Sequence, residues 1–250
     1  MKILVIITGS NGGIGKELKL QYFNDKKYLV MGVDLESKNS LENEHYFLKL
    51  DFSKKFTISR QAKIFNKIKH IKNKNNLKKI ILINNAAVQI IKPIQNVELN
   101  DIEESISVNL TYPMMLSKLL LRVTSPKDLK IFNVSSIHSK LTKSGFSLYA
   151  LSKSALDSLT KSLNIEFAHK GLIVNSISPA AIETSMLKKG FSGKKDKLLK
   201  LKKFHPTKSI GSAKDLAIFI KTITQLDQVF LSGAKFEYDG GISNLLHDPN

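Results

Sequence analysis

Short apolar runs rich in β-branched residues alternate with amphipathic helical segments along nearly the whole chain. The runs have the length of buried strands, and the segments between them repeat their apolar residues at helical spacing. The runs cover Lys2–Thr8, Tyr28–Asp34, His45–Leu50, Lys79–Asn84, Lys130–Ser135, Ile173–Ser178 and Lys235–Tyr238, and the helical segments lie near 14–24, 56–72, 101–123, 150–169 and 213–224. Strands that are apolar on both faces and joined by helices predict a parallel sheet covered on both sides. With right-handed crossovers, we expect an α/β fold with a single doubly wound sheet of about seven strands and a site beyond their carboxyl ends.

The chain length of 250 residues suits one α/β domain, and no linker, repeat or low-complexity tract divides it. We therefore expect residues 1–250 to form one domain. The absence of cysteine excludes disulfides and thiolate metal sites, and no metal site is expected. The first apolar run is too short for a signal peptide, and no stretch approaches the ~20 apolar residues that cross a bilayer. We expect a cytoplasmic protein that does not bind membranes.

A glycine-rich turn, Gly9-Ser10-Asn11-Gly12-Gly13-Ile14-Gly15, joins the first predicted strand to the first helix. At such a turn, backbone N–H groups and a helix N-terminus can approach a pyrophosphate. The spacing is G-x-x-x-G-x-G, which differs from the common dinucleotide pattern G-x-G-x-x-G. An ordinary glycine turn is the alternative, but the strand–turn–helix order favours a nucleotide site.

Tyr149 and Lys153 lie four residues apart in a segment with a helical pattern. On a helix, this spacing places a phenol and an ammonium side by side. A lysine cation lowers the pKa of a neighbouring phenol, which can then exchange a proton with a substrate oxygen. The same spacing also occurs on solvated helix surfaces, so the pair alone does not decide the function.

Taken in order, these and further motifs resemble those of the short-chain dehydrogenase/reductase family over nearly the whole chain. The motifs are Thr8-Gly9-x-x-x-Gly13-Ile14-Gly15, Asn84-Asn85-Ala86-Ala87, Asn109, Ser135-Ser136, Tyr149-x-x-x-Lys153, Pro179-Ala180 followed by Thr184, and Tyr238-Asp239-Gly240-Gly241. Ser136 precedes Tyr149 by thirteen positions, the spacing of that family. The resemblance implies a Rossmann fold and an oxidoreductase that moves hydride between NAD(H) and a secondary alcohol or ketone.

The resemblance also implies a catalytic set of Asn109, Ser136, Tyr149 and Lys153. Tyr149 would be the general acid for carbonyl reduction and the general base for alcohol oxidation, and Ser136 would hydrogen-bond the substrate oxygen. Lys153 would lower the pKa of Tyr149 and hold the nicotinamide ribose. Asn109 would hold a water that relays protons to solvent.

The cofactor-binding residues implied in the same way are Gly9, Ser10, Asn11, Gly13, Ile14, Gly15, Asp34, Asp51, Phe52, Asn85, Ala86, Tyr149, Lys153, Pro179, Ile182 and Thr184. Asp51 and Phe52 would contact the adenine, while Thr184 and the backbone near Ile182 would hold the carboxamide. Ala87 and Ala180 replace glycines of the family pattern. Because alanine resists positive φ angles, the backbone geometry at these two positions is in question.

Asp34 ends the second predicted strand, where a carboxylate can accept hydrogen bonds from ribose hydroxyls and repels a 2′-phosphate. Gly12 stands where NADP-dependent members of the family often have arginine or lysine. We therefore expect NAD rather than NADP as the cofactor. Lys38, beyond the strand end, is the residue that could favour NADP instead.

The net charge of +18 suggests a nucleic-acid partner, but the residues that carry this charge do not support one. Only Arg60 and Arg122 are arginines, whereas nucleic-acid readers usually depend on arginine for bidentate contacts. In the helical pattern of 60–79, the lysines surround apolar residues at helical spacing, as on a solvated amphipathic helix, so we expect no nucleic-acid binding. The segment 188–203 is an exception with eight lysines, and in the family it belongs to a substrate lid, here 183–205. These lysines either attract an anionic or carrier-linked small-molecule substrate, or are a solvated helix surface.

The leading function is therefore an NAD(H)-dependent alcohol dehydrogenase or ketone reductase. An NADPH-dependent 3-oxoacyl-carrier reductase, a sugar or polyol dehydrogenase and a non-catalytic cofactor-sensing protein are the alternatives. The pocket lining is expected from 88–95, 137–148 and 183–205, which do not reveal the substrate. The family usually forms dimers or tetramers through two helices, whose apolar outer positions here include Met114, Leu120, Leu156 and Leu163.

Overall fold

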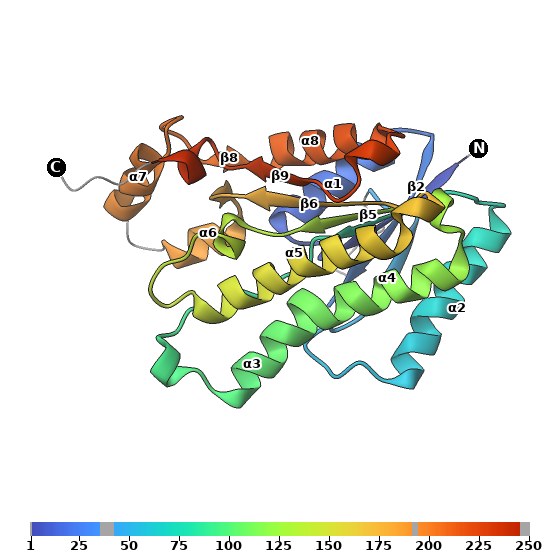
Figure 1. Ribbon diagram of the computed structural model, residues 1–250, viewed down its shortest axis with the longest axis horizontal. Coiled ribbons are helices and arrows are strands. Elements are labelled where there is room, and N and C mark those ends of the chain that lie inside the picture. Colours follow the sequence, from blue (N-terminus) through green and yellow to red (C-terminus); the bar gives the residue numbers. More distant parts are fainter. Residues whose placement is uncertain (1, 36–42, 192–194, 246–250) are drawn as a thin grey trace.

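A fully parallel seven-stranded sheet forms the centre of the computed structural model, which describes residues 2–35, 43–191 and 195–245. The strand order is β3–β2–β1–β4–β5–β6–β9 (Figure 1). The strands are β1 (Ile3–Thr8), β2 (Tyr28–Asp34), β3 (Tyr46–Lys49), β4 (Ile80–Asn84), β5 (Leu129–Val134), β6 (Ile173–Pro179) and β9 (Lys235–Tyr238). Each of the seven predicted runs is therefore confirmed as a strand, and its ends lie within one residue of the prediction.

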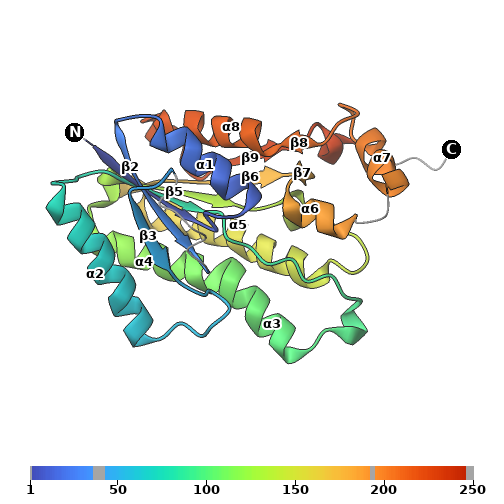
Figure 2. The ribbon, with the colours of Figure 1, turned by 180° about the vertical axis from the view of Figure 1, so that it is seen from behind.

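Helices cover both faces of this sheet, as Figures 1 and 2 show from opposite sides. α1 (Gly13–Phe23) and α8 (Ala213–Gln225) lie on one face. α2 (Ile58–Lys74), α4 (Tyr112–Val123) and α5 (Ser147–Phe167) lie on the other. The predicted doubly wound Rossmann architecture is confirmed.

The continuous apolar character of the strands follows from these two layers. In β1, Leu4 and Ile6 belong to the core under α2, α4 and α5, while Val5 and Ile7 belong to the core under α1 and α8. Successive strand residues point to opposite faces, so a sheet covered on both sides needs apolar residues at every position. Full burial of each such side chain contributes roughly 1.5–3 kcal/mol.

The predicted helix 101–123 is interrupted. α3 (Leu99–Ile106) passes into one turn of π-helix, η2 (Ser107–Thr111), before α4 begins. Such π turns are often found at functional sites. Asn109, one of the predicted catalytic residues, lies in the middle of this turn.

The predicted lid contains two helices that the sequence pattern did not separate. They are α6 (Ser185–Gly190) and α7 (Lys195–Phe204), and a small two-stranded sheet of β7 (Ile182–Glu183) and β8 (Gly211–Ser212) flanks them. Figure 1 shows both helices at the end of the molecule toward which the arrows of β6 and β9 point. The lid segment thus lies beside the carboxyl ends of the strands.

Three of the four apolar positions expected on the outside of the paired helices lie in the core instead. Leu120, Leu156 and Leu163 are buried, because their helix faces pack on the sheet, and only Met114 is exposed. The exposed apolar side chains of α5 are Leu151 and Ile165. Within the described ranges, no helix is long and apolar enough to cross a membrane.

Candidate active site

The carboxyl ends of the central strands border a cavity with a volume of about 1050 Å³. Fourteen of the residues predicted for the site line it: Gly9, Gly13, Ile14, Asp34, Asp51, Phe52, Asn85, Ala86, Ser136, Tyr149, Lys153, Pro179, Ile182 and Thr184. Four others, Ser10, Asn11, Gly15 and Asn109, do not. Residues from distant parts of the sequence thus meet in one place, as expected for the edge where parallel strands end.

The glycine-rich turn is held by close backbone contacts that exclude side chains. Gly9 has a φ of +64°, and a Cβ on Gly15 would lie 2.0 Å from the Gly9 carbonyl oxygen. Gly12 donates its N–H to the same carbonyl at 3.1 Å, and α1 begins at Gly13. The turn therefore brings the N-terminus of α1 to the cavity wall, where unpaired N–H groups favour an anion.

Asn85 attaches this turn to the neighbouring strand. Its Nδ2 donates to the carbonyl oxygens of Thr8 at 3.0 Å and Gly9 at 3.1 Å. The Thr8 hydroxyl in turn accepts the N–H groups of Asn85 and Ala86, both at 3.0 Å. Asn85 is therefore a positioning residue for the loop as well as part of the cavity wall.

Asp34 lines the cavity at the end of β2 with its carboxylate fixed by two backbone donors. The N–H groups of Asn11 and Leu35 each donate to it at 2.7 Å. Asn11 is itself held by Lys19, whose Nζ donates to Asn11 Oδ1 at 3.0 Å and lies 3.5 Å from Glu44 Oε2. Sequence reasoning missed this buried Lys19–Glu44 pair, because a helix residue and a loop residue showed no common pattern. Lys38 lies outside the described residues.

Asp51 and Phe52 follow β3 and line the same cavity. The Phe52 ring stacks on Tyr112 with a centroid distance of 4.2 Å, and Asp51 Oδ1 accepts the N–H of Ser53 at 2.9 Å. The Phe52 side chain is thus held by α4, and the Asp51 carboxylate is held within its own turn.

The two alanines that replace family glycines cause no backbone strain. Neither Ala87 nor Ala180 has a positive φ angle, and both lie on the cavity wall. Ala180 extends the pairing of β6 with β9, because its N–H donates to the Tyr238 carbonyl at 3.1 Å. The question raised by these two positions is therefore answered in favour of an intact loop geometry.

Thr184 lies between the glycine turn and the lid. Its Oγ1 accepts the N–H of Leu187 at 3.3 Å, and a Cβ on Gly13 would lie 2.8 Å from Thr184 Cγ2. Ile182, in β7, is buried and lines the cavity with Pro179 at the end of β6. These residues bring the lid segment into direct contact with the start of α1.

Ser136, Tyr149 and Lys153 converge at the end of β5. Ser136 follows β5, and Tyr149 and Lys153 project from the first turns of α5. Lys153 Nζ lies 5.7 Å from the centroid of the Tyr149 ring and donates to the Val134 carbonyl at 2.8 Å. The i, i+4 spacing thus produces the predicted side-by-side arrangement.

The pKa of Tyr149 is raised rather than lowered, contrary to the expectation from its lysine neighbour. Burial raises the pKa of Tyr149 to about 12, and a hydrogen-bonding contact with Ser136 only partly lowers it. Burial also lowers the pKa of Lys153 to about 8, against the attraction of Asp157. Both shifts have the same main cause, because burial disfavours the charged form of each group.

Asn109 is fully buried and uses its side chain for structure. Its Oδ1 accepts the N–H of Val88, and its Nδ2 donates to the Val88 carbonyl and to Ser152 Oγ, each at 2.9 Å. The side chain therefore links the π turn, the segment after β4 and α5. These three contacts fix the orientation of the amide, and the water-holding role of Asn109 stays a prediction.

His138 lies in the predicted lining segment 137–148, where either a position at the cavity rim or surface or a role as a second candidate acid is expected for it. It stacks on Phe146 at 4.5 Å and meets the Tyr149 ring edge-to-face at 5.9 Å, so it lies beside the candidate acid. The C-terminal residues Ile242, Ser243 and Leu245 also line the cavity. The aspartate–glycine–glycine motif before them could have indicated their position. Asp239 accepts the N–H groups of Gly241 and Ser243 and so fixes the turn that brings them to the cavity.

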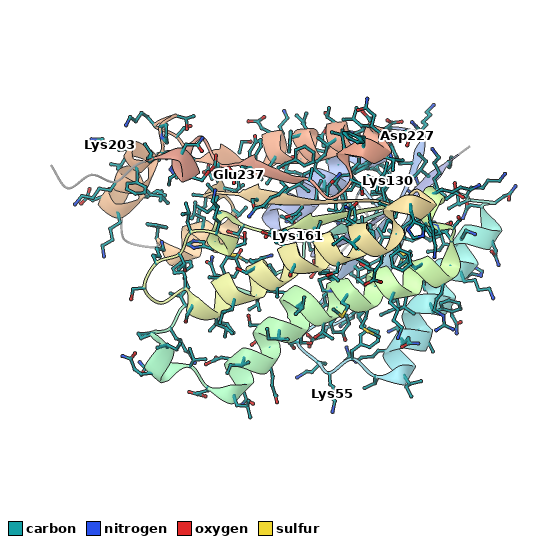
Figure 3. The ribbon with its side chains drawn as sticks, in the orientation of Figure 1. Lys55, Lys130, Lys161, Lys203, Asp227 and Glu237 are labelled. Atoms are coloured by element: carbon teal, nitrogen blue, oxygen red, sulfur yellow. The ribbon has the colours of Figure 1, made fainter. Side chains whose placement is uncertain are left out.

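The remaining wall is largely apolar. It comes from the three predicted lining segments and the C-terminal turn, and includes Ile91, Leu141, Phe146, Met186, Leu187, Phe191, Leu201, Phe204 and Leu245. None of the described lid lysines lines the cavity. Lys197, Lys200 and Lys203 are exposed, and Figure 3 labels Lys203 on α7 at the outer end of the molecule.

These features fit a dinucleotide. Across the sheet, the cavity passes an acidic residue at the end of β2, the glycine-rich N-terminus of α1 and a tyrosine–lysine pair at the end of β5. In this order, these groups suit the ribose, the pyrophosphate and the nicotinamide end of a dinucleotide. No group of three or more metal-ligating side chains occurs in the part of the chain that the structure describes.

Comparison with known proteins agrees with this geometry. The family model "short chain dehydrogenase" matches residues 3–195. The 3-oxoacyl-[acyl-carrier-protein] reductase FabG of Buchnera aphidicola subsp. Baizongia pistaciae is 28% identical over 249 residues, covering 96% of this chain and 97% of the relative.

Two solved structures are also similar. 4-Hydroxyisoleucine dehydrogenase complexed with NADH has a TM-score of 0.82 at 26% identity, and ElxO with NADP bound has a TM-score of 0.85 at 26% identity. Each alignment covers 98% of this chain and 100% of the other. The chain therefore belongs to the short-chain dehydrogenase family and is an NAD(P)-dependent oxidoreductase.

Proposed function

We propose that the protein transfers hydride between NAD(H) and a secondary alcohol or ketone, with Tyr149 as the general acid/base. The observation that carries this proposal is the convergence of Ser136, Tyr149 and Lys153 on the cavity that also contains Asp34 and the glycine turn. Hydride exchange at a substrate carbon requires a proton at the attached oxygen, and a buried phenol beside a hydroxyl is suited to supply it.

The bound nicotinamide would supply or accept the hydride. In carbonyl reduction, the Tyr149 hydroxyl donates its proton to the substrate oxygen, and in alcohol oxidation it accepts one. Ser136 donates a hydrogen bond to the same oxygen and stabilises its developing negative charge. Lys153 offsets the negative charge of the phenolate and is then available to the nicotinamide ribose. Asn109 positions α5 through Ser152 and keeps the π turn in place.

Asp34 supports NAD(H) over NADP(H). Its carboxylate lines the cavity beside Asn11, while the nearby Glu44 is paired with the Lys19 ammonium. A 2′-phosphate at this position would be repelled by the Asp34 carboxylate. The glycine turn offers no basic side chain to offset this repulsion at position 12, which is a glycine.

The apolar wall favours a ketone or alcohol that carries an apolar chain over a sugar or polyol. A second candidate within this class is reduction of a 3-oxoacyl group on a carrier. The observation that favours it is an apolar cavity with the exposed lysines of α7 outside it. Lys143 adds a cation at the cavity wall, with its Nζ 4.4 Å from the centroid of the Phe146 ring. A carrier-linked substrate combines an apolar acyl chain with an anionic carrier, which suits this arrangement.

The direct test is a panel of ketones and alcohols, including short acyl thioesters and aldoses, followed by NAD(P)H absorbance with both cofactors. Tyr149→Phe keeps the ring and deletes the proton carrier, so kcat should fall by about 10²-fold or more while cofactor affinity is retained. Turnover unchanged in this variant would contradict the assignment of Tyr149. Cofactor binding without turnover of any substrate by the unmodified protein would support the non-catalytic alternative.

A homodimer or homotetramer is proposed on the same basis. The exposed apolar residues Met114, Leu151 and Ile165 on α4 and α5 support an interface on these helices. Sedimentation analysis of the unmodified protein and of a Leu151→Glu variant tests this assignment, because a charge in a subunit interface should shift the protein toward monomer.

A further inference from the structure

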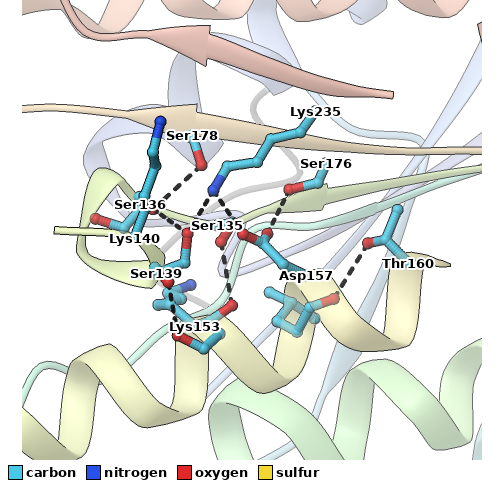
Figure 4. Close-up of polar contacts among 12 residues, drawn as sticks. Ser135, Ser136, Ser139, Lys140, Lys153, Asp157, Thr160, Ser176, Ser178 and Lys235 are labelled. Carbon is cyan, nitrogen blue, oxygen red and sulfur yellow. Dashed lines mark hydrogen bonds and ion pairs between the residues drawn. The ribbon is translucent and has the colours of Figure 1, made fainter. Parts of the chain in front are cut away.

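A polar network with a buried carboxylate at its centre joins α5, β6, β9 and the segment after β5, which carries Ser136 (Figure 4). At its centre is Asp157, one helical turn after Lys153 on α5 and largely buried. Asp157 Oδ1 accepts the hydroxyl of Ser176 at 2.6 Å, and its Oδ2 lies 2.8 Å from Lys235 Nζ. Ser176 belongs to β6 and Lys235 to β9, so one carboxylate joins α5 to two strands.

From Lys235, the network continues to the serine that we place at the substrate oxygen. Lys235 Nζ donates to Ser139 Oγ at 2.7 Å, and Ser139 Oγ donates to the Ser136 carbonyl at 2.8 Å. The hydroxyl of Ser178 donates to the same carbonyl at 3.1 Å. The backbone of Ser136 is therefore held from two sides.

The same network also reaches Lys153. Ser135 Oγ donates to the Lys153 carbonyl at 3.3 Å, and Ser154 Oγ donates to the Ser139 carbonyl at 2.8 Å. These bonds tie the first turns of α5 to the segment after β5 that carries Ser136. Tyr149, Lys153 and Asp157 follow one another at intervals of four residues along one face of α5.

We propose that Asp157 and Lys235 are positioning residues for the reaction, which together fix Ser136 and Lys153 in their catalytic arrangement. This inference rests on the proposed function. Neither residue needs to touch the substrate. Asp157 acts on Lys153 through its charge and through α5, and Lys235 acts on Ser136 through Ser139.

A purely stabilising ion pair would not require this placement. The Lys130–Asp227 pair, at 2.7 Å and labelled in Figure 3, provides the comparison. Lys130 lies at the start of β5, whereas the network lies at the end of that strand. Both pairs join β5 or its neighbours to other elements, but only the Asp157–Lys235 pair contacts residues bonded to Ser136 and Lys153.

The test compares Asp157→Asn and Lys235→Met with the matched control Lys130→Met, using the full chain and the best substrate of the panel. The two network variants should lose about 10²-fold in kcat because Ser136 is displaced, with little change in the KM for the cofactor. Lys130→Met should keep kcat within about twofold although it loses an ion pair of similar length, whose carboxylate on Asp227 is more exposed than that of Asp157. Lys235→Arg should recover part of the lost rate, because it restores a cation opposite Asp157.

A pH profile separates positioning from a general loss of structure. Asp157→Asn removes the negative charge that favours the Lys153 ammonium, so the alkaline fall in kcat for carbonyl reduction should move to lower pH. Lys130→Met should leave this profile unchanged. Equal kcat values and pH profiles in the network variants and in Lys130→Met would overturn the positioning role while Tyr149→Phe stays inactive. An active Tyr149→Phe would instead overturn the proposed function itself.

Discussion

The Lys153 ammonium donates a hydrogen bond of 2.8 Å to the main-chain carbonyl of Val134, the last residue of β5. This bond fixes a buried cation at the end of the strand that leads to Ser136, with the Tyr149 ring beside it. Lys153 is 1% exposed, so water hardly stabilises its ammonium and neighbouring protein groups have to do so. The pKa of about 8 that burial gives this lysine makes the site sensitive to pH in the neutral to alkaline range.

Replacement of Lys153 by methionine should abolish activity without unfolding the protein. Methionine has a similar length and avoids the cost of burying an ammonium, so the melting temperature should stay equal or rise. The kcat should fall by about 10²-fold or more, since the phenolate loses its neighbouring cation. In the unmodified enzyme, kcat for carbonyl reduction should decrease as the pH rises through about 8, where Lys153 loses its proton according to its pKa. Calorimetry and steady-state rates at several pH values check both statements, and a variant with normal kcat would contradict them.

Asp34→Ala should relax the cofactor preference. Without the carboxylate, the 2′-phosphate of NADP(H) meets less negative charge, while the ribose hydroxyls of NAD(H) lose an acceptor. The ratio of kcat/KM for NADP(H) to that for NAD(H) should increase at least about tenfold, which corresponds to ~1.4 kcal/mol. If the unmodified enzyme already prefers NADP(H), our interpretation of Asp34 is wrong.

Gly15→Ala should weaken cofactor binding. The added Cβ would lie 2.0 Å from the Gly9 carbonyl oxygen, so the glycine turn and α1 have to move apart. Titration of NADH fluorescence should show an affinity at least about tenfold weaker, with far-UV circular dichroism confirming a folded chain. Gly190→Ala is the matched control, because its Cβ meets nothing within 4 Å. Equal affinities in the two variants would mean that the turn does not bind the cofactor.

His138 should make the folded state less stable in acid. Burial, reinforced by Lys143, lowers the pKa of this histidine from 6.5 to about 4. Between these two values, the unfolded chain binds more protons at this position than the folded chain, so the free energy of unfolding rises with pH. The contribution is complete above pH 6.5 and is lost as the pH falls toward 4. Denaturant titrations at several pH values give the free energy of unfolding of the unmodified protein and of His138→Phe. Plotted against pH, the two free energies should change in parallel except between pH 4 and 6.5, where only the unmodified protein gains the contribution of His138. Parallel plots across this window would contradict this account.

The sheet and the location of the site could be predicted from the sequence, because both depend on local patterns. A strand buried on both faces has to be apolar throughout, and motifs at the ends of parallel strands meet at one edge. Gly9, Asn85, Ser136 and Thr184 therefore came together as expected.

Properties that depend on contacts between distant elements could not be predicted. The pKa of Tyr149 is governed by how deeply α5 and β5 bury it, and this depth has no sequence signature. The π turn at Asn109 depends on Val88 and Ser152, which lie in two other segments. The positions of Leu120, Leu156 and Leu163 could not be predicted for the same reason. Helical spacing shows which residues share a helix face, but not which face packs on the sheet.

The lysines of α7 should matter only for an anionic or carrier-linked substrate. Lys197, Lys200 and Lys203 are exposed and do not line the cavity, so they can act only through long-range attraction. For an acyl-carrier substrate, kcat/KM should fall several-fold as ionic strength rises from about 0.01 to 0.15 M, because the Debye length shrinks from about 30 to 8 Å. Replacement of the three lysines by glutamine should produce the same loss at low salt and remove most of the salt dependence. A small neutral ketone serves as the control and should respond to neither change. If the carrier-linked substrate is equally indifferent to salt, these lysines are a solvated helix surface.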